Sequence, residues 1–266
     1  MEQAASPRTS PANGRLWGSR ARDWADFQEV QCSAAYEAVF DSLSLRPGTR
    51  YCDLGCGAGL AAMLAAGRGA EVSGIDAAES LLEIARERVT GADFHLGDLE
   101  ELPFPDGTFD VVTGFNAFQF AASPMAALRE ARRISKPSGR IVVLTWGNPQ
   151  GMEAAAIVGA LRPLLPPAPP GAPGPFALSD ETALRAFAAS AGLSALEVCD
   201  VACPWHYKDL VTALRGLGSS GVAAKAAEHA SFDAVNQAHA AALAPFRQHD
   251  GSYRLAASFR WLLAAP

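Results

Sequence analysis

The feature that most constrains this chain is a run of alternating glycines, Gly55, Gly57 and Gly59, directly after a short apolar segment. Glycine adopts backbone conformations that other residues avoid, and its missing side chain lets a ligand approach the amide groups. A dinucleotide-binding fingerprint would need another glycine three positions after Gly57, where this chain has Leu60. The segment therefore predicts a strand, a ligand-binding turn and a helix from about Leu60, without a dinucleotide.

An acidic residue precedes these glycines and narrows the chemistry of the ligand. With no pyrophosphate to bind, the turn suits a nucleoside that carries an amino-acid tail. The ammonium group of such a tail needs an acceptor, and the carboxylate of Asp53 provides one. We therefore expect the ligand to contact Asp53, Gly55, Cys56, Gly57 and Gly59.

The first half of the chain alternates short β-branched segments with helical patterns, which is typical of βαβ units around a parallel sheet. Five strands are predicted at residues 50–55, 71–76, 93–98, 109–116 and 140–147. Between the second and third of these, apolar residues recur at helical spacing and predict a helix at residues 77–89.

The second half begins with a proline-rich segment, in which seven of the thirteen residues 163–175 are proline. Proline lacks a backbone donor, so this segment predicts a stiff linker or the edge of a lid. Ser179 is expected to cap a helix at residues 180–191 that Gly192 closes. A sixth strand is predicted at residues 195–205 and a seventh at 253–264, with a helical insertion at 209–246 between them.

Composition excludes several classes of protein. The net charge is −6 and the sequence pI is about 5.4, with no Lys/Arg-dense stripe, so a nucleic-acid partner is not expected. No apolar run approaches the roughly 20 residues that span a bilayer, and the N-terminus lacks the apolar core of a secretory signal. The five cysteines form no CxxC pair, which predicts reduced thiols, a cytoplasmic location and no metal site.

At this point the sequence resembles the class I S-adenosylmethionine-dependent methyltransferases, of the type found in ubiquinone and menaquinone biosynthesis and in natural-product tailoring. The resemblance covers about residues 17–148, including Phe109-Asp110-Val111-Val112 and the 132–140 segment, where Ser138 stands in place of a usual glycine. It implies an α/β, Rossmann-like fold with seven mostly parallel strands, an antiparallel last strand, helices on both faces and a helical cap between strands 6 and 7.

The resemblance also implies a domain organisation. Residues 1–15 are expected to form a flexible N-terminus and residues 16–266 the methyltransferase domain. Within that domain, residues 16–150 form the cofactor-binding core, 151–178 the proline-rich linker or lid, and 206–250 the cap. The protein is expected to be a monomer or a homodimer that acts on a small molecule.

The family's binding pattern implies roles for particular residues. The Asp-x-Gly-x-Gly-x-Gly turn holds the methionine part of S-adenosylmethionine and of the product S-adenosylhomocysteine. Asp76, followed by Ala77, stands where the family has the acidic residue that binds the ribose hydroxyls, and a carboxylate accepts well from a diol. Asp98 and Leu99 stand in the adenine-binding turn, Asp98 toward the exocyclic amine and the Leu99 amide toward the ring.

The N-terminal segment resembles the family's leading helix, which often folds over the cofactor. Trp17 and Trp24 are seven residues apart and can share a helix face. Aromatic faces attract a sulfonium cation by about 0.5–2 kcal/mol. The alternative is that both tryptophans simply pack against the sheet.

Substrate residues are expected at the carboxyl ends of the strands, where ligands bind in open α/β sheets. We assign Asn116 and Phe118 to the cofactor, and to the substrate we assign Gln119, Phe120, Trp146, Asn148, Trp205 and Tyr207. This set is aromatic and nearly uncharged, which indicates an apolar or aromatic acceptor. Methyl transfer is an in-line displacement in which a base is optional, and His206 is the histidine at a carboxyl strand end.

Other functions remain open at this stage. A nicotinamide oxidoreductase is disfavoured because Leu60 replaces a glycine and no Tyr-x-x-x-Lys pair occurs. The Asp/Asn-Pro-Pro-Tyr/Phe segment of DNA and protein-glutamine methyltransferases is absent after the fourth strand, where the chain has Phe115-Asn116-Ala117-Phe118. An enzyme that binds S-adenosylmethionine without transferring its methyl group, such as a cyclase, and a ligand-binding module both share the motifs used here.

Overall fold

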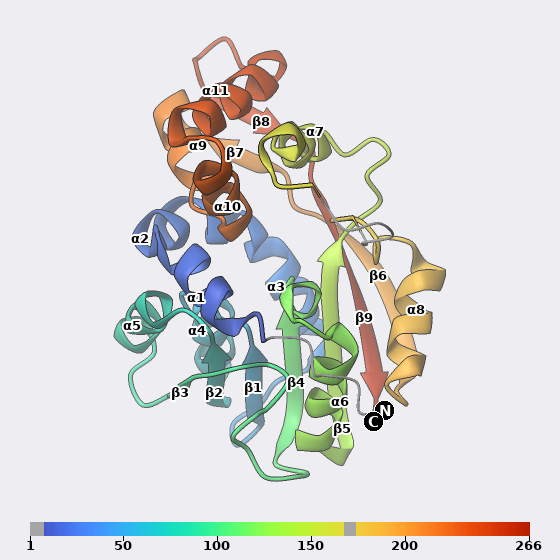
Figure 1. Cartoon of the computed structure of the whole chain (residues 1–266). Coiled ribbons are helices and arrows are strands. Elements are labelled where there is room, and N and C mark those ends of the chain that lie inside the picture. Colours follow the sequence, from blue (N-terminus) through green and yellow to red (C-terminus); the bar gives the residue numbers. More distant parts are fainter. Residues whose placement is uncertain (1–7, 168–173) are drawn as a thin grey trace, which may run out of the picture.

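The computed structural model describes residues 8–167 and 174–266, and its centre is a seven-stranded sheet (Figure 1). The strand order is β3-β2-β1-β4-β5-β9-β6. The bounds are β1 (Arg50–Leu54), β2 (Glu71–Asp76), β3 (Asp93–Leu96), β4 (Phe109–Phe115), β5 (Ser135–Trp146), β6 (Ser194–Ala202) and β9 (Ser258–Ala265). Only β9 runs antiparallel to its neighbours in this sheet, β5 and β6. The predicted α/β fold with an antiparallel last strand is confirmed.

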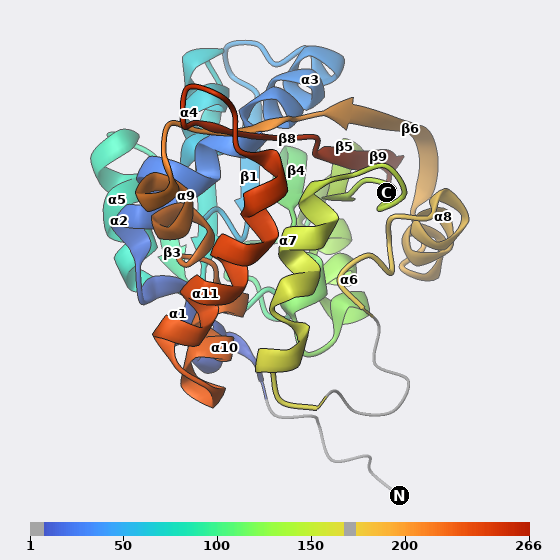
Figure 2. The same ribbon diagram turned by 90° about the horizontal axis from the view of Figure 1, so that it is seen from above.

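Helices cover both faces of the sheet (Figure 2). One face packs against α3 (Ser33–Leu43), α4 (Leu60–Gly67) and α5 (Glu79–Arg88), and the other against α6 (Pro124–Ile134) and α8 (Glu181–Ser190). Successive residues of a strand point to opposite faces, so Val111 joins the first core and Val112 the second. This burial on both faces explains why the central strands β1 and β4 are largely apolar, whereas the edge strand β6 is exposed or half-buried along its length.

Two predicted strands are each interrupted in the structure. The predicted sixth strand ends at Ala202, and Trp205–Tyr207 form a separate strand, β7. The predicted seventh strand divides into β8 (Tyr253–Leu255), which pairs with β7, and β9. Pro204 lies at the first break and cannot donate to a ladder, which accounts for the change of sheet.

Helix boundaries differ from the expected ones by one or two residues. Asp180, and not Ser179, caps α8: its carboxylate accepts from the Ala183 amide at 2.9 Å, whereas the Ser179 hydroxyl donates to the Phe176 carbonyl. Asp180 is better placed than Ser179 to cap the helix, because it directly precedes the first helical residue. Gly192 follows α8 with φ +80°, as predicted for a helix end.

The N-terminal segment is helical from Ser10, so residues 10–15 do not form the flexible tail that was expected. Helix α1 (Ser10–Gly18) is followed by α2 (Ala21–Asp23), a π-helical turn η1 (Trp24–Gln28) and a 3₁₀ turn η2 (Glu29–Cys32). Residues 1–7 lie outside the described part of the chain. Gly14 and Gly18 bring α1 close to the chain after β2: a β-carbon on Gly14 would lie 2.1 Å from the Ala77 carbonyl oxygen.

The insertion between β7 and β8 is helical. It contains α9 (Leu210–Leu217), α10 (Gly221–His229), α11 (Phe232–Leu243) and the turn η5 (Ala244–Phe246). The side chains of Asp209, Ser220 and Ser231 cap the three helices. These helices form the predicted cap, and they pack against α1, η1 and α7 (Ala154–Ala160).

The proline-rich segment is described only at its two ends. Its first part includes the 3₁₀ turn η4 (Arg162–Leu164), and residues 168–173 lie outside the described residues. Among the helices that the structure describes, none combines the length and apolar character needed to cross a membrane.

Candidate functional site

The three glycines after β1 serve different purposes. All have positive φ, at +72° for Gly55, +54° for Gly57 and +81° for Gly59. A β-carbon on Gly59 would lie 2.8 Å from the Ala85 side chain, so this glycine permits contact between α4 and α5. A β-carbon on Gly55 would lie 2.6 Å from Ala117. A β-carbon on Gly57 would make only ordinary contacts, 3.5 Å from Glu29 Oε1 and from Trp24 Nε1, so Gly57 is the position where a ligand can approach the turn.

A cavity of about 130 Å³ lies beside Gly57 at the carboxyl ends of β1 to β4. Among the predicted residues it is lined by Trp17, Trp24, Gly55, Gly57, Asp76, Ala77, Asp98, Leu99, Asn116 and Phe120. The structure therefore brings together residues from six separate segments that the sequence had placed only by analogy or strand position. Phe120 was expected to bind the substrate but shares this cavity with the residues expected to bind the cofactor.

The two carboxylates predicted to hold the nucleoside both reach the cavity. Asp76 accepts from the amides of Gly57 and Ala78, each at 2.9 Å, and burial raises its pKa. Asp98 accepts from the Glu100 amide at 2.9 Å and from the Ser10 hydroxyl at 2.7 Å. A carboxylate offers about four lone-pair sites, so each retains capacity for a ligand.

Asp53 does not line the cavity. Its side chain is buried behind the turn, where Oδ1 accepts from the Thr113 hydroxyl at 2.9 Å, and Thr113 in turn lies 2.6 Å from the Tyr51 hydroxyl. Burial raises the pKa of Asp53 to about 7. In this structure Asp53 therefore supports the turn from within, and its direct contact with an ammonium group stays a prediction.

Several other predicted site residues lie elsewhere. His206 is exposed on β7, where its backbone pairs with the Gln31 side chain, so the structure gives no support to its prediction as a base. Asn148 is exposed and accepts from the Gln150 amide. Gln119 donates to Asn116 at 3.3 Å without lining the cavity.

The remaining predicted residues belong to the packed interior. Trp146 stacks on Phe259 with ring centroids 5.0 Å apart and also contacts Trp205. Trp205 and Tyr207 are buried in the core under the cap. Phe118 and Cys56 are likewise core residues, Phe118 against Gly114 and Cys56 on the opposite face of the sheet. The structure thus places these residues in or against the hydrophobic core and not around the cavity beside Gly57.

Sequence reasoning missed about half of the lining. The missed residues are Thr9, Ser10, Asn13, Cys32, Tyr36, Leu81, Gly97, Phe115, Ala117 and Ala121. Phe115 and Ala117 flank Asn116, so the end of the fourth strand could have indicated them. Cys32 and Tyr36 share a helix face at a spacing of four, but no sequence signal connects that face to the glycine turn.

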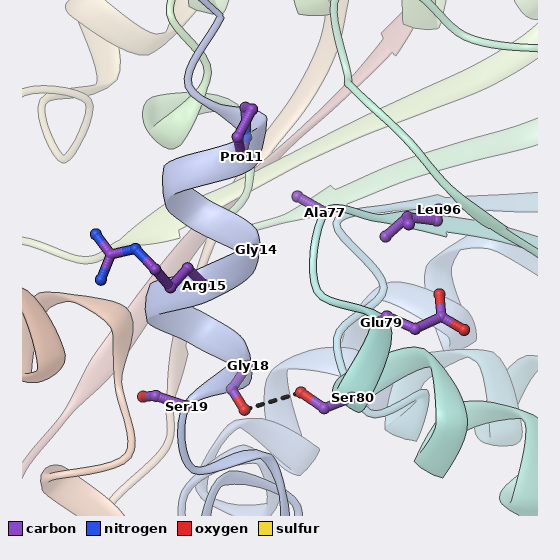
Figure 3. A pocket seen from close by; sticks show the side chains of 9 residues that line it. All are labelled: Pro11, Gly14, Arg15, Gly18, Ser19, Ala77, Glu79, Ser80 and Leu96. Atoms are coloured by element: carbon purple, nitrogen blue, oxygen red, sulfur yellow. Dashed lines mark hydrogen bonds between the residues drawn. The ribbon is translucent and has the colours of Figure 1, made fainter.

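Helix α1 closes the cavity on one side. Thr9 and Asn13 both donate to the Phe120 carbonyl, at 3.0 and 2.8 Å, and Ser10 donates to Asp98. On its other side, α1 borders an open groove of about 400 Å³ that includes Arg15, Glu79 and Leu96, and the Ser80 hydroxyl donates to the Gly18 carbonyl at 2.8 Å (Figure 3). The cavity is smaller than the roughly 300 Å³ at which ligand pockets usually begin, and α1 borders it.

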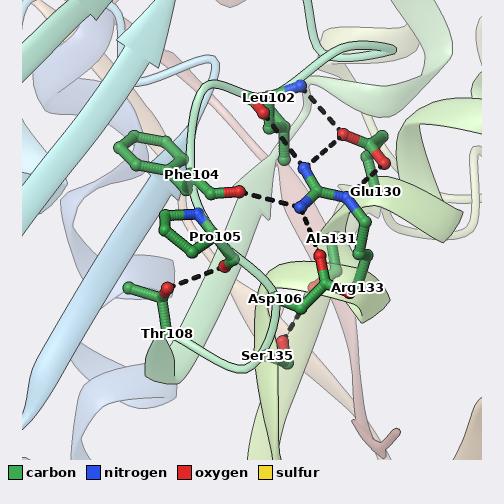
Figure 4. Close-up of polar contacts among 9 residues, drawn as sticks. All are labelled: Leu102, Phe104, Pro105, Asp106, Thr108, Glu130, Ala131, Arg133 and Ser135. Carbon is green, nitrogen blue, oxygen red and sulfur yellow. Dashed lines mark hydrogen bonds and ion pairs between the residues drawn. The ribbon is translucent and has the colours of Figure 1, made fainter.

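The segment after β3 is held from α6. The Arg133 guanidinium donates to the carbonyls of Leu102 and Phe104, at 3.0 and 2.8 Å, and to the carboxylates of Glu130 and Asp106 (Figure 4). Glu130 accepts from the Leu102 amide at 2.9 Å. These contacts fix the chain immediately after the Asp98 turn.

Comparison with known proteins identifies the family. A family model described as a methyltransferase domain matches residues 52–143. The malonyl-[acyl-carrier protein] O-methyltransferase of Erwinia pyrifoliae is 30% identical over 210 residues, which cover 77% of this chain and 74% of that protein. The chain belongs to the class I S-adenosylmethionine-dependent methyltransferases. Its cofactor is S-adenosylmethionine.

Other relatives of this methyltransferase match over shorter stretches. The 27-O-demethylrifamycin SV methyltransferase of Amycolatopsis mediterranei is 32% identical over 157 residues, covering 53% of this chain and 58% of that protein. The chain spans about half the length of the first curated relatives it matches. Among solved structures, the [4+2]-cyclase SpnF has a TM-score of 0.55 at 21% identity, covering 87% of this chain and 80% of that one, and shows the shared fold.

The residues around the cavity fit the cofactor of this family. The space next to Gly57, the two carboxylates after β2 and β3, and the surrounding aromatic rings match an amino-acid end, a nucleoside and a sulfonium in chemical character. In the described part of the chain, no cluster of three or more His, Cys, Asp or Glu residues is arranged to hold a metal ion.

Proposed function

We propose that this methyltransferase transfers a methyl group from S-adenosylmethionine to a small, apolar or aromatic molecule by in-line displacement. The observation that carries the proposal is the cavity, which Gly57, Asp76 and Asp98 line at the carboxyl ends of β1, β2 and β3. We assign these three positions to the methionine, ribose and adenine of the cofactor. When bound, the cofactor supplies the sulfonium-bound methyl group. The protein's residues bind the cofactor, orient it toward the acceptor and exclude water from the site.

The nucleoside is held by carboxylates. Asp76 ends β2 and accepts from the ribose hydroxyls, while Asp98 and the Leu99 amide face the adenine. Because Ser10 already donates to Asp98, the adenine amine shares this carboxylate with α1 or displaces the Ser10 hydroxyl. The closing helix and the cofactor are thus linked at one residue.

The acceptor end of the cavity is apolar. Cys32, Tyr36 and Phe115 line it together with Asn116, and the rings of Tyr36 and Phe115 have centroids 4.6 Å apart. Such a surface selects an apolar or aromatic acceptor, with the Asn116 amide to orient a polar atom. Asn116 adopts a left-handed conformation, φ +51°, which turns its side chain out of the strand direction.

Orientation carries most of the proposed catalysis. Well-oriented reactants gain up to about 7–11 kcal/mol, so transfer to a nucleophilic acceptor does not require a base. Burial raises the pKa of the Tyr36 phenol well above its usual value, so Tyr36 acts as a hydrogen-bond donor and not as a base.

Isothermal calorimetry with S-adenosylmethionine, and with NADH as the control, tests the cofactor site. We expect micromolar binding of S-adenosylmethionine alone. Incubation with candidate acceptors then tests transfer, since methylated product and S-adenosylhomocysteine must form in equal amounts. A product that forms while S-adenosylmethionine stays intact would support a cyclase-like reaction, an alternative that the fold of SpnF makes worth testing.

A further inference from the structure

The space next to Gly57 is bounded by two polar atoms of opposite character. Glu29 Oε1 and Trp24 Nε1 each lie 3.5 Å from the position that a β-carbon on Gly57 would take. A ligand atom in that space lies at contact distance from a carboxylate oxygen and from an indole N–H. The first accepts hydrogen bonds from a cation, and the second donates to an anion.

Glu29 is a buried carboxylate that the proposed reaction has not yet used. Glu29 lies on η2 and is 3% exposed. One oxygen, Oε2, pairs with Arg88, and the other, Oε1, accepts only a long bond of 3.3 Å from the Leu60 amide. A carboxylate has about four lone-pair sites, so Oε1 retains capacity toward the space over Gly57.

Arg88 fixes this carboxylate against the glycine turn. Its guanidinium donates to Glu29, to the Ala58 carbonyl at 2.9 Å and to the Ala25 carbonyl at 3.0 Å. One side chain thus joins α5, the turn and the N-terminal segment. The position of Glu29 relative to Gly57 is therefore determined by several bonds and not by a single flexible side chain.

The acidic residue of the glycine motif does not compete for this role. Asp53 is 2% exposed, accepts from Thr113 and has no atom within 4 Å of the position that a β-carbon on Gly57 would take. Glu29 is thus the carboxylate that approaches Gly57, with Oε1 3.5 Å from that position. The methionine end of the cofactor carries one ammonium and one carboxylate, which complement Glu29 and Trp24 Nε1.

We propose that Glu29 receives the ammonium group, and Trp24 Nε1 the carboxylate, of the cofactor's methionine end. This inference rests on the proposed placement of that end at Gly57. It makes the N-terminal segment, and not only the glycine turn, responsible for distinguishing the complete cofactor from a nucleoside without an amino-acid tail.

Calorimetry with three ligands tests the proposal: S-adenosylmethionine, S-adenosylhomocysteine and 5′-methylthioadenosine, which has no amino-acid end. Glu29→Gln should bind the first two about tenfold or more weakly and change the affinity for methylthioadenosine by less than about twofold, because charged hydrogen bonds contribute most of this difference. Trp24→Phe keeps the aromatic ring and should show the same selectivity, at about three- to tenfold.

Glu87→Gln provides the matched control, because Glu87 pairs with Arg22 and so joins the same two segments at an exposed site away from the turn. It should bind all three ligands as the wild type does. A Glu29→Gln protein that loses all three ligands equally, or none, overturns the role of Glu29. If circular dichroism shows that Glu29→Gln does not fold, the test rests on Trp24→Phe. A Trp24→Phe protein that loses affinity for all three ligands equally, or for none, then decides against the proposal. A wild type that binds methylthioadenosine as tightly as S-adenosylmethionine instead refutes the placement of the methionine end.

Discussion

At the scale of single residues, buried carboxyl groups determine the chemistry around the glycine turn. Asp53, Asp76 and Glu29 all lie within or beside it, and burial raises the pKa of each. Arg88 opposes the shift at Glu29, and backbone amides oppose it at Asp76. Each carboxyl therefore contributes differently to stability and to binding.

Asp53 should make the stability of the protein depend on pH. Its folded pKa of about 7 exceeds the unfolded value of 3.8, so the folded state holds the proton more tightly. Stability is then greatest at low pH for this group and falls as pH rises from about 4 to 7. The Asp53→Asn side chain can still accept from Thr113 but does not titrate. It should therefore remove the loss of stability that Asp53 contributes as pH rises. Thermal unfolding at pH 5 and pH 8 checks it: the variant should gain stability relative to wild type at pH 8, and an identical pH profile would contradict the assignment.

Asp76 should contribute directly to cofactor affinity. Replacing it with alanine removes the acceptor for the ribose hydroxyls and leaves the Gly57 and Ala78 amides without their partner. We expect Asp76→Ala to weaken binding of S-adenosylmethionine by about 1–3 kcal/mol. Calorimetry measures this loss of affinity. Asp41→Ala is the control, because the Asp41 carboxylate is exposed and pairs with Arg68. Unchanged affinity in Asp76→Ala would show that the ribose lies elsewhere.

At the scale of elements, α6 holds the loop between β3 and β4 in place. This loop has no regular structure to satisfy its carbonyls, and Arg133 supplies donors to two of them while its charge is neutralised by Glu130 and Asp106. A planar guanidinium with five donors suits this task better than an ammonium. The loop carries the Asp98 turn, so its rigidity bears on the adenine end of the cavity.

Arg133→Met should therefore affect stability more than binding. It leaves the Leu102 and Phe104 carbonyls without donors, and we expect the free energy of unfolding to fall by about 1–3 kcal/mol. Denaturant unfolding measures this loss. Arg185→Met is the control, because Arg185 forms an exposed i,i+4 pair with Glu181 that contributes little. Equal stability of the two variants would contradict a specific role for Arg133.

At the scale of the whole molecule, the cap packs against the N-terminal helices that border the cavity. A β-carbon on Gly221 of α10 would lie 2.5 Å from Trp17 Nε1, and Arg215 of α9 pairs with Asp23. Trp17 in turn lines the cavity, with its ring 5.0 Å from that of Trp24. The cap thus contacts the N-terminal helices that line the cavity and does not line the cavity itself.

Two glycine variants test this arrangement by the sign of their effects. Alanine normally stabilises a helix relative to glycine by up to about 1 kcal/mol. Gly159→Ala in α7, where a β-carbon meets nothing within 4 Å, should follow this rule. Gly221→Ala should instead destabilise the protein and change the fluorescence of Trp17, because α10 must move away from the ring. A stabilised Gly221→Ala protein would show that the cap and α1 are not tightly packed.

The sequence by itself determined the features that arise within one continuous segment. The strands, the glycine turn, the helix after it and the acidic residues that end β2 and follow β3 follow from local patterns, because strand burial and positive φ depend on residue type. The helical insertion was also predicted, because residues 209–246 are rich in alanine and helical in pattern. The sequence did not reveal that Pro204 divides the last two strands between two sheets.

Only the tertiary structure decided which side chains share the cavity. Glu29 meets Gly57, and Ser10 meets Asp98, through contacts between segments far apart in the chain. The same reason explains why Asp53, His206 and Trp146 do not line the cavity: the neighbouring elements bury or expose their side chains. The direction of a side chain is set by what packs against it, and that information is not contained in any one segment.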